Sequence, residues 1–327
     1  MKTKNNLQLT LLNNVPIIIF IVFFVITGLL EPKFFSMQNV ENIFKSSSHI
    51  GVLAIGMTFV LLTGGIDLSV GSTMYLSAGL VGVLTVERGF PIWLAIVLAF
   101  ACSLVIGLAN GILVAKLKLL PFLATMAMQV LMRGVALLVT ESRPIKLPQA
   151  FSGLGSVRLF GLIPVPIALL LFFLLIAAIF LSYTAKGRQI YAVGNNEEAA
   201  RLAGINKDNI LLISYVLCSV FACAAGLIAV TQYGLISAAF GEGIEFNAIA
   251  AAVLGGVSLA GGVGKVFPGT LIGTLLIQMI QIALVYLKVD LYITSIISAL
   301  VIFVAVFLDS FRLSILRKME RRHIFKA

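Results

Sequence analysis

Long apolar stretches recur along this chain, separated by short segments that carry most of its charged residues. A helix that crosses a bilayer needs roughly 20 apolar residues, and the pattern predicts about ten such helices. Their expected positions are 15–30, 50–63, 72–86, 91–115, 119–140, 162–183, 210–235, 246–260, 267–287 and 291–309.

Composition supports an all-α integral membrane protein. Hydrophobic residues make up 60% of the chain, charged residues 11%, and the mean hydropathy is +1.11, which leaves too little polar surface for a soluble globule. We expect a cytoplasmic tail at 1–14, a transmembrane domain at 15–310 and a basic cytoplasmic tail at 311–327. Segment 15–30 is followed by Glu31, Pro32 and Lys33 rather than a small-residue cleavage site, so it is interpreted as the first permanent span.

The net charge of +10 indicates the orientation of the chain. Lys and Arg near membrane spans are retained on the cytoplasmic side, and the ten-helix arrangement places nearly all of the excess positive charge on one side when both termini are cytoplasmic. This explanation makes nucleic-acid binding unnecessary. The basic segment Arg312–Lys326 is expected to contact anionic lipid headgroups, with a cytoplasmic partner protein as the alternative.

Glycines are concentrated in three places. Gly107 and Gly111 lie one helical turn apart, a spacing that lets two helices approach closely. The clusters within 64–71 and 255–264 instead predict broken helices, because paired glycines with Asp67 or Pro268 nearby interrupt a regular span. Non-helical backbone at membrane depth persists only where protein or water covers it, and such breaks form substrate paths in transporters.

The two broken segments also resemble each other. GGIDL at 64–68 aligns with GGVSL at 255–259, an offset of 191 residues. This favours an internal duplication, while the frequency of Gly and Leu in apolar sequence leaves chance coincidence as the alternative.

The polar loop 184–209 contains one predicted amphipathic short helix, 197–204. Asn195 or Asn196 can cap it, Glu198 lies three residues after Asn195 as in a capping box, and Gly204 can close it. A helix this short is not stable alone in water, so its small apolar face must pack on something. That face, formed by Ala199, Ala200, Leu202 and Ala203, fits either a groove of a partner protein or the inner membrane surface.

Several polar side chains fall inside or near the predicted spans, where an unpaired polar group is costly. They are candidates for a substrate path, with interhelical hydrogen bonds as the alternative: Asn110, Gln129, Arg133, Gln232, Asn247, Gln278 and Gln281. Arg133 could also extend outward to the interface. Asp67 could cap the start of a half-helix by accepting amide hydrogens from Ser69 or Val70.

Three motifs resemble the ribose/xylose/arabinose/galactoside branch of the ABC (ATP-binding cassette) import permeases, a binding-protein-dependent group similar to branched-chain amino acid permeases. The first, TGGIDLSVG at 63–71, includes Gly65, Ile66, Asp67, Leu68, Ser69 and Gly71. The second, GNNEEAARLAGI at 194–205, includes Asn196, Glu197, Glu198, Ala199, Ala200, Leu202 and Gly204, and is similar to the segment through which import permeases contact their ATPases. The third, 248–264, includes Gly255, Gly256, Gly261 and Gly262.

The resemblance implies a permease in the bacterial inner membrane that imports a small sugar. It implies three kinds of partner: ATPase subunits that carry ATP and Mg²⁺, an extracytoplasmic solute-binding protein, and a second permease copy or paralogue. The chain has no Walker-type phosphate loop, so ATP hydrolysis would belong to the partner. No cofactor, metal site or catalytic residue is expected in the chain, whose two histidines and three cysteines form no ligand or nucleophile pattern.

Alternatives remain open at this stage. Within the family, the solute could be a nucleoside, a furanosyl signalling molecule or a branched-chain amino acid. An ion-coupled secondary transporter would require several buried carboxylates, and a channel would require charged rings or a repeated filter sequence. The sequence shows neither several carboxylates within the predicted spans nor a clear ring of charges or repeated filter sequence.

Overall fold

The computed structural model describes residues 15–290 together with Ile293, Ile296, Ile297, Ala299, Leu300, Phe303 and Phe307. The predicted tenth span and both tails therefore lie mostly outside the described residues. The α-helices are α2 (Val15–Leu30), α3 (Met37–Leu62), α4 (Val70–Gly82), α5 (Ile92–Gly111), α6 (Pro121–Val139), α7 (Gln149–Ser152), α8 (Val165–Tyr183), α9 (Ala185–Asn195), α10 (Glu197–Leu202), α11 (Lys207–Tyr233), α12 (Ile244–Leu254) and α13 (Leu271–Tyr286).

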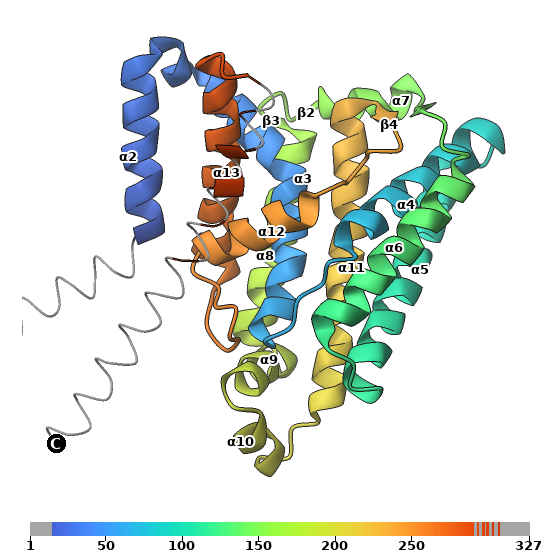
Figure 1. Cartoon of the computed structure of the whole chain (residues 1–327). Helices are drawn as coiled ribbons and strands as arrows, with labels where there is room; N and C mark the ends of the chain where they lie inside the picture. The colour runs from blue at the N-terminus through green and yellow to red at the C-terminus, as the bar shows by residue number, and fades with distance from the viewer. Residues whose placement is uncertain are drawn as a thin grey trace, which may run out of the picture.

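Short elements extend or connect these helices. Two are 3-10 turns, η1 (Pro32–Phe35) and η4 (Gly153–Gly155), and three are π-type turns, η2 (Val83–Glu87), η3 (Ile112–Lys116) and η5 (Val266–Thr270). Two antiparallel ribbons pair β1 (Ile145–Lys146) with β4 (Leu235–Ile236) and β2 (Arg158–Leu159) with β3 (Ile163–Pro164). Figure 1 shows both ribbons at the end of the bundle opposite α9 and α10.

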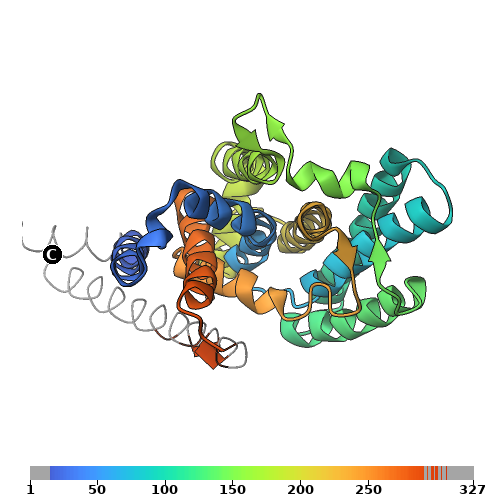
Figure 2. The ribbon, with the colours of Figure 1, turned by 90° about the horizontal axis from the view of Figure 1, so that it is seen from above.

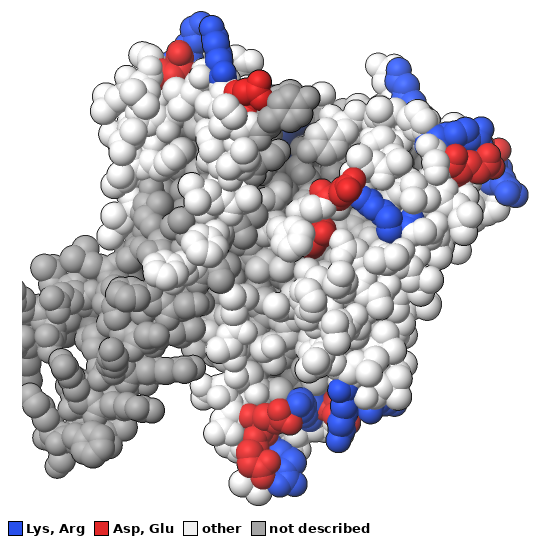
Figure 3. All heavy atoms as spheres, in the orientation of Figure 1, with Lys and Arg blue, Asp and Glu red and all other residues white. Residues whose placement is uncertain are grey.

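Seven helical segments among the described residues are long and apolar enough to cross a membrane. They are α3, α4 with η2, α5 with η3, α6, α8, α11, and η5 with α13. On the face drawn in Figure 3, charged side chains gather at the two ends, with one small group between them on an otherwise uncharged flank. This distribution is the one expected of a multi-pass membrane protein.

Helices α3 and α11 form the interior of the bundle. In their most apolar stretches 89% of α3 and 72% of α11 is buried, against 22% of α6. Figure 2 shows α11 lying between the other helices. The predicted close approach at Gly107 is confirmed, because a Cβ added there would lie 2.7 Å from the Cα of Val216 on α11.

The predicted eighth span, 246–260, is helical only in part. Helix α12 ends at Leu254, and its 11 residues extend about 16 Å, roughly half the hydrocarbon core of a bilayer. Figure 1 shows α12 lying across the bundle between its ends. The predicted second span, in contrast, is too short, since α3 continues back to Met37 through a polar stretch that the apolar pattern did not include.

The chain leaves the helical conformation at 63–69 and at 255–265, where the glycine clusters predicted breaks. Both helices end in the same way. The Gly64 and Gly65 amides donate to the Leu61 and Val60 carbonyls, and the equivalent pair after α12 donates to Val253 and Ala252. Gly64 and its counterpart Gly256 have φ of +77° and +91°, the left-handed residue of a Schellman cap.

These caps change the predicted duplication in one respect. The matching residues are Gly64 and Gly256, an offset of 192 residues rather than 191. Beyond the caps the segments diverge, since α4 begins at Val70 whereas η5 begins only at Val266. The likeness is therefore a shared helix ending followed by different connections.

Candidate functional site

Segment 184–209 forms two short helices, where the sequence predicted one. Helix α9 begins where Thr184 Oγ1 accepts a hydrogen bond from the Gly187 amide at 3.0 Å, and α10 begins where Asn196 Oδ1 accepts one from the Ala199 amide at 2.9 Å. Helix α9 was not predicted from the sequence, although Thr184 is an ordinary N-cap signal.

The ends of α10 differ in part from the prediction. The capping box does not form, because Asn195 ends α9 and Glu198 instead pairs with Arg201 at 2.6 Å. The expected closure at Gly204 is present, with φ of +78°. The helix itself ends at Leu202.

The apolar face predicted on α10 divides into two parts. Ala200 is 4% exposed and packs into its own chain, so it does not belong to a docking face. Ala199, Leu202 and Ala203 are exposed, with Leu202 at 77%. These three residues are called the α10 docking face below.

Three backbone segments meet beside α9, at a place called the coupling junction below: Leu62 at the end of α3, Gly194 in α9, and Gly262 in the loop after α12. The Gly262 amide donates to the Leu62 carbonyl at 2.9 Å. A Cβ added to Gly194 would collide with that carbonyl oxygen and would lie 2.6 Å from the Gly262 nitrogen. Both broken segments therefore touch the helix that leads into α10.

A side-chain hydrogen bond adds to the same contact. Tyr191 on α9 donates its hydroxyl hydrogen to the Gly264 carbonyl at 3.0 Å. Burial raises the pKa of Tyr191, which keeps the hydroxyl protonated and able to donate.

The first broken segment is held by a buried polar group. Asp67 is fully buried and accepts hydrogen bonds from the Ser69 amide at 2.9 Å and the Ser69 hydroxyl at 2.6 Å, as the sequence suggested for the start of a half-helix. Asn110 of α5 donates to Ser69 Oγ at 2.8 Å. The structure thus places Asn110 at the support of non-helical backbone.

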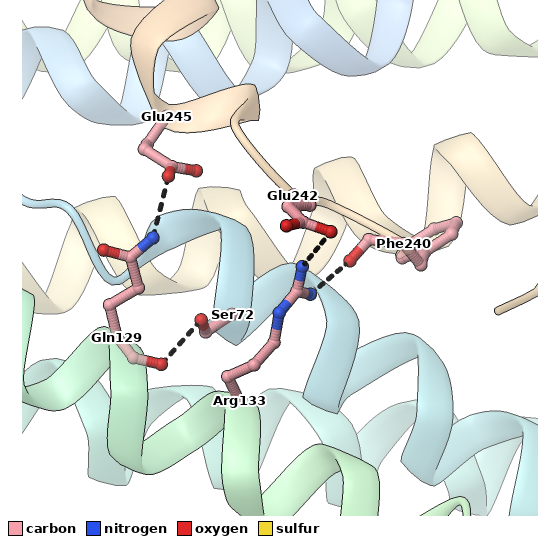
Figure 4. Close-up of polar contacts among 6 residues, drawn as sticks. All are labelled: Ser72, Gln129, Arg133, Phe240, Glu242 and Glu245. Atoms are coloured by element: carbon pink, nitrogen blue, oxygen red, sulfur yellow. Dashed lines mark hydrogen bonds and ion pairs between the residues drawn. The ribbon is translucent and has the colours of Figure 1, made fainter. Parts of the chain in front are cut away.

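A second polar network joins α6 to the start of α12 (Figure 4). Gln129 donates to Glu245 at 2.7 Å. Arg133 donates to the Phe240 carbonyl at 2.7 Å, lies 3.7 Å from the Glu242 carboxylate, and stacks 5.2 Å from the centroid of the Tyr75 ring.

The side chains of this network differ in exposure: Arg133 is 20% exposed, whereas its ion-pair partner Glu242 is 74% exposed. One expectation needs correction. Glu245, which the predicted spans leave in the loop before 246–260, is 2% exposed in the first turn of α12. Its proximity to Gln129 could not be found from the sequence, since the two residues are 116 positions apart.

A cavity of about 310 Å³ lies beside this network. It is bounded by α3, α4, α11, α12, α13 and the segment that precedes α12. Its lining consists of His49, Ile50, Met74, Tyr233, Ala239, Phe240, Gly241, Glu242, Ile244, Asn247, Gln278 and Gln281. His49 Nε2 lies 3.3 Å from the Tyr233 hydroxyl, and Gln278 donates to Gln281 at 3.1 Å.

The polar residues singled out from the sequence therefore separate into groups. Asn247, Gln278 and Gln281 share the cavity, whereas Gln129 binds Glu245 and Gln232 donates to the Lys45 carbonyl at 2.9 Å. His49 and Tyr233 belong to the cavity but were not predicted. Among the described residues, no group of three or more His, Cys, Asp or Glu side chains could hold a metal ion.

Comparison with known proteins identifies the family. The profile described as "Branched-chain amino acid transport system / permease component" matches residues 39–306. The chain belongs to this permease family. No solved structure matches the permease at a significant level.

Named relatives cover nearly the whole permease. The ribose import permease protein RbsC of Escherichia coli (strain K12) is 39% identical over 90% of this chain and 92% of its own length. The ribose import permease of Bacillus subtilis (strain 168) is 37% identical, covering 87% and 88%. The autoinducer 2 import system permease of Yersinia pseudotuberculosis serotype O:1b (strain IP 31758) is 36% identical, covering 91% and 85%. The chain is thus a multi-pass transport subunit.

Proposed function

We propose that this permease is the membrane-spanning subunit of an ATP-driven importer for a small sugar in a bacterial inner membrane. Two relatives that match nearly all of the chain are named as ribose import permeases. The chain itself has no Walker-type loop. ATP and Mg²⁺ would therefore be bound by partner ATPase subunits, and energy would enter through contact.

The observation that carries this proposal is the coupling junction. A force applied to α10 passes through α9 to Gly194, which touches both the end of α3 and the loop after α12. Because α12 is short and lies between two non-helical segments, it can shift without breaking a continuous spanning helix. The α10 docking face is exposed and available to an ATPase.

Transport would proceed by alternating access. A partner shifts a conformational equilibrium only by binding the two states with different affinity. In this proposal, ATP-bound ATPases prefer one position of α9 and α10, and the junction transmits that preference to α3 and α12. The remaining parts of the importer would be a second permease and a solute-binding protein at the opposite end, with about ten spans and both termini in the cytoplasm.

A second candidate solute is a furanosyl signalling molecule, because the Yersinia relative is named as an autoinducer 2 permease. Ribose and this molecule are both small and rich in hydroxyl groups, so one permease fold can serve either. Competition between unlabelled autoinducer 2 and labelled ribose during uptake would separate the two assignments.

The test is uptake of labelled D-ribose into proteoliposomes that contain the permease, its ATPase and its binding protein. We expect accumulation that requires ATP and every one of the three components. The permease alone should give no accumulation above protein-free liposomes. Ribose uptake by the permease alone, or driven by a proton or sodium gradient without nucleotide, would contradict the proposal and favour a secondary transporter.

A further inference from the structure

The geometry points to the cavity between α3, α11, α12 and α13 as a binding site for one uncharged, polyhydroxylated molecule of monosaccharide size. This inference rests on the proposed function and deepens it, since it locates where the permease recognises its solute. The cavity extends from the middle of the bundle, where His49 lies midway along α3 and Gln278 midway along α13, to the exposed end of α11 at Tyr233.

The lining combines two chemical surfaces. Ile50, Met74, Phe240 and Ile244 offer apolar contact, which suits the C–H face of a sugar ring. A polar set faces the same space, namely His49, Tyr233, Asn247, Gln278 and Gln281. Amide, imidazole and phenol groups both donate and accept hydrogen bonds, as sugar hydroxyls do.

The amides of this polar set retain unused hydrogen-bonding capacity. The pair between Gln278 and Gln281 uses one amide nitrogen and one carbonyl oxygen. The side-chain oxygen of Gln278, the side-chain nitrogen of Gln281 and the whole side-chain amide of Asn247 have no hydrogen bond to any residue that the structure describes. Since unpaired amides at membrane depth are costly, water or a ligand must supply partners there.

The charge of the lining and the size of the cavity limit which class of ligand can bind. Among the described residues that line the cavity, Glu242 is the only acidic residue, and there is no Lys or Arg. The Glu242 carboxylate already pairs with Arg133. A zwitterionic amino acid would need a matched cation and anion facing the cavity, which these residues do not offer. A volume of about 310 Å³ lies at the lower end of the roughly 300–1,000 Å³ typical of small-molecule sites, so the cavity suits a single sugar ring.

The cavity is also connected to the coupling junction. Helix α3 carries His49 in the cavity wall and Leu62 in the junction, about 20 Å apart along one rigid helix. Helix α12 contributes Asn247 to the wall and leads into the loop that contains Gly262. A movement that changes the junction therefore changes the cavity, as solute release requires.

The test is protection of an engineered cysteine. Gln281→Cys would be made in a permease whose native Cys102, Cys218 and Cys223 are replaced by serine, and labelled with a small maleimide in proteoliposomes. Gln149→Cys, at an exposed position at the start of α7, is the matched control. We expect a saturating D-ribose, D-xylose or D-galactose probe to slow labelling at position 281 at least about fivefold and to leave position 149 unchanged.

A second measurement, of transport kinetics, tests the site even if the cysteine variant labels poorly or folds incorrectly. Uptake by Gln278→Ala and Gln281→Ala in the complete importer should show KM raised about tenfold, the loss expected for one or two hydrogen bonds, with ATPase docking unchanged. Gln149→Ala should keep the wild-type KM. Unchanged KM in both cavity variants, or protection by L-leucine and by none of the three sugars, would overturn the site.

The labelling assay needs no nucleotide, so its failure can be distinguished from failure of the proposed function. Protection without ATP-dependent uptake would retain the site and remove the ABC mechanism. ATP-dependent uptake of ribose without protection or a KM change would retain the importer and place its recognition site elsewhere.

Discussion

At Gly194 the lack of a side chain allows three backbone segments to touch. A methyl group on Gly194 would overlap with the Leu62 carbonyl and the Gly262 amide, which pack directly against its Cα. In the proposed mechanism, the coupling junction would transmit movement through backbone contact, which is stiffer than contact between flexible side chains. Adding one methyl group should separate α9 from both broken segments.

Gly194→Ala is predicted to uncouple the permease. The added Cβ would collide with the Leu62 carbonyl, so α9 must move away from α3. We expect ATP-driven uptake to fall at least about tenfold, with a stability loss of about 1–3 kcal/mol. Uptake and thermal unfolding in detergent measure the two effects. Gly153→Ala is the control, because a methyl group added there has nothing within 4 Å and the variant should behave as wild type. Normal uptake by Gly194→Ala would remove the junction from the mechanism.

At the scale of elements, the interior depends on close packing between α5 and α11. Gly107 faces the backbone of Val216, and Gly111 faces that of Leu212. A larger residue at either position would hold the two helices apart. Gly134, on the outer helix α6, has nothing within 4 Å of an added Cβ.

Gly107→Leu is therefore predicted to destabilise the permease by at least about 1–3 kcal/mol, the usual cost of overpacking. Gly134→Leu, the same change at an open position, should leave the midpoint of thermal unfolding unchanged or slightly higher, since leucine favours helix more than glycine. Thermal unfolding of the two variants in one detergent gives the comparison. Equal midpoints would show that α5 and α11 are not closely packed.

Part of this architecture could be predicted from the sequence, because the responsible signals are local. The lengths of the apolar stretches predicted most of the spans, and the paired glycines predicted both helix breaks. Asn196 and Gly204 predicted the two ends of α10. Features that depend on contacts between distant segments could not be predicted. The burial of Glu245 and the inward position of Ala200 follow from packing, and α12 was too apolar to reveal that it is short.

The candidate site shows the same division. The residues of α10 and the broken segments were identified from motifs, whereas His49 and Tyr233 were not. Each looks ordinary in its own helix, and only the packing of α3 against α11 brings the His49 ring within 5.6 Å of the Tyr233 ring centroid. Polar residues in the spans were named together from the sequence, which could not separate Asn247 and Gln278, which line the cavity, from Asn110 and Gln129.

At the scale of the whole molecule, the permease has the exposed short helix α10 at one end, a polar cavity that reaches the middle of α3 and α13, and two broken segments between them. Figure 1 shows this order along the bundle, from α10 through the end of α3 to α12. The arrangement suits a transport subunit that receives its energy from a partner protein. The central claim is that α10 receives this energy from an ATPase.

The most direct measurement is ATP-driven uptake by Leu202→Asp in proteoliposomes that contain the whole importer, together with copurification of the ATPase. Leu202 is 77% exposed on the α10 docking face, so the change should leave folding intact while placing a charge in the contact. Leu162→Asp, 75% exposed at the opposite end beside β3, is the matched control for ATPase binding. We expect Leu202→Asp to lose ATPase binding and at least about tenfold of uptake, whereas Leu162→Asp keeps the ATPase bound. Full ATP-driven uptake by Leu202→Asp, with the ATPase still bound, would contradict the central claim.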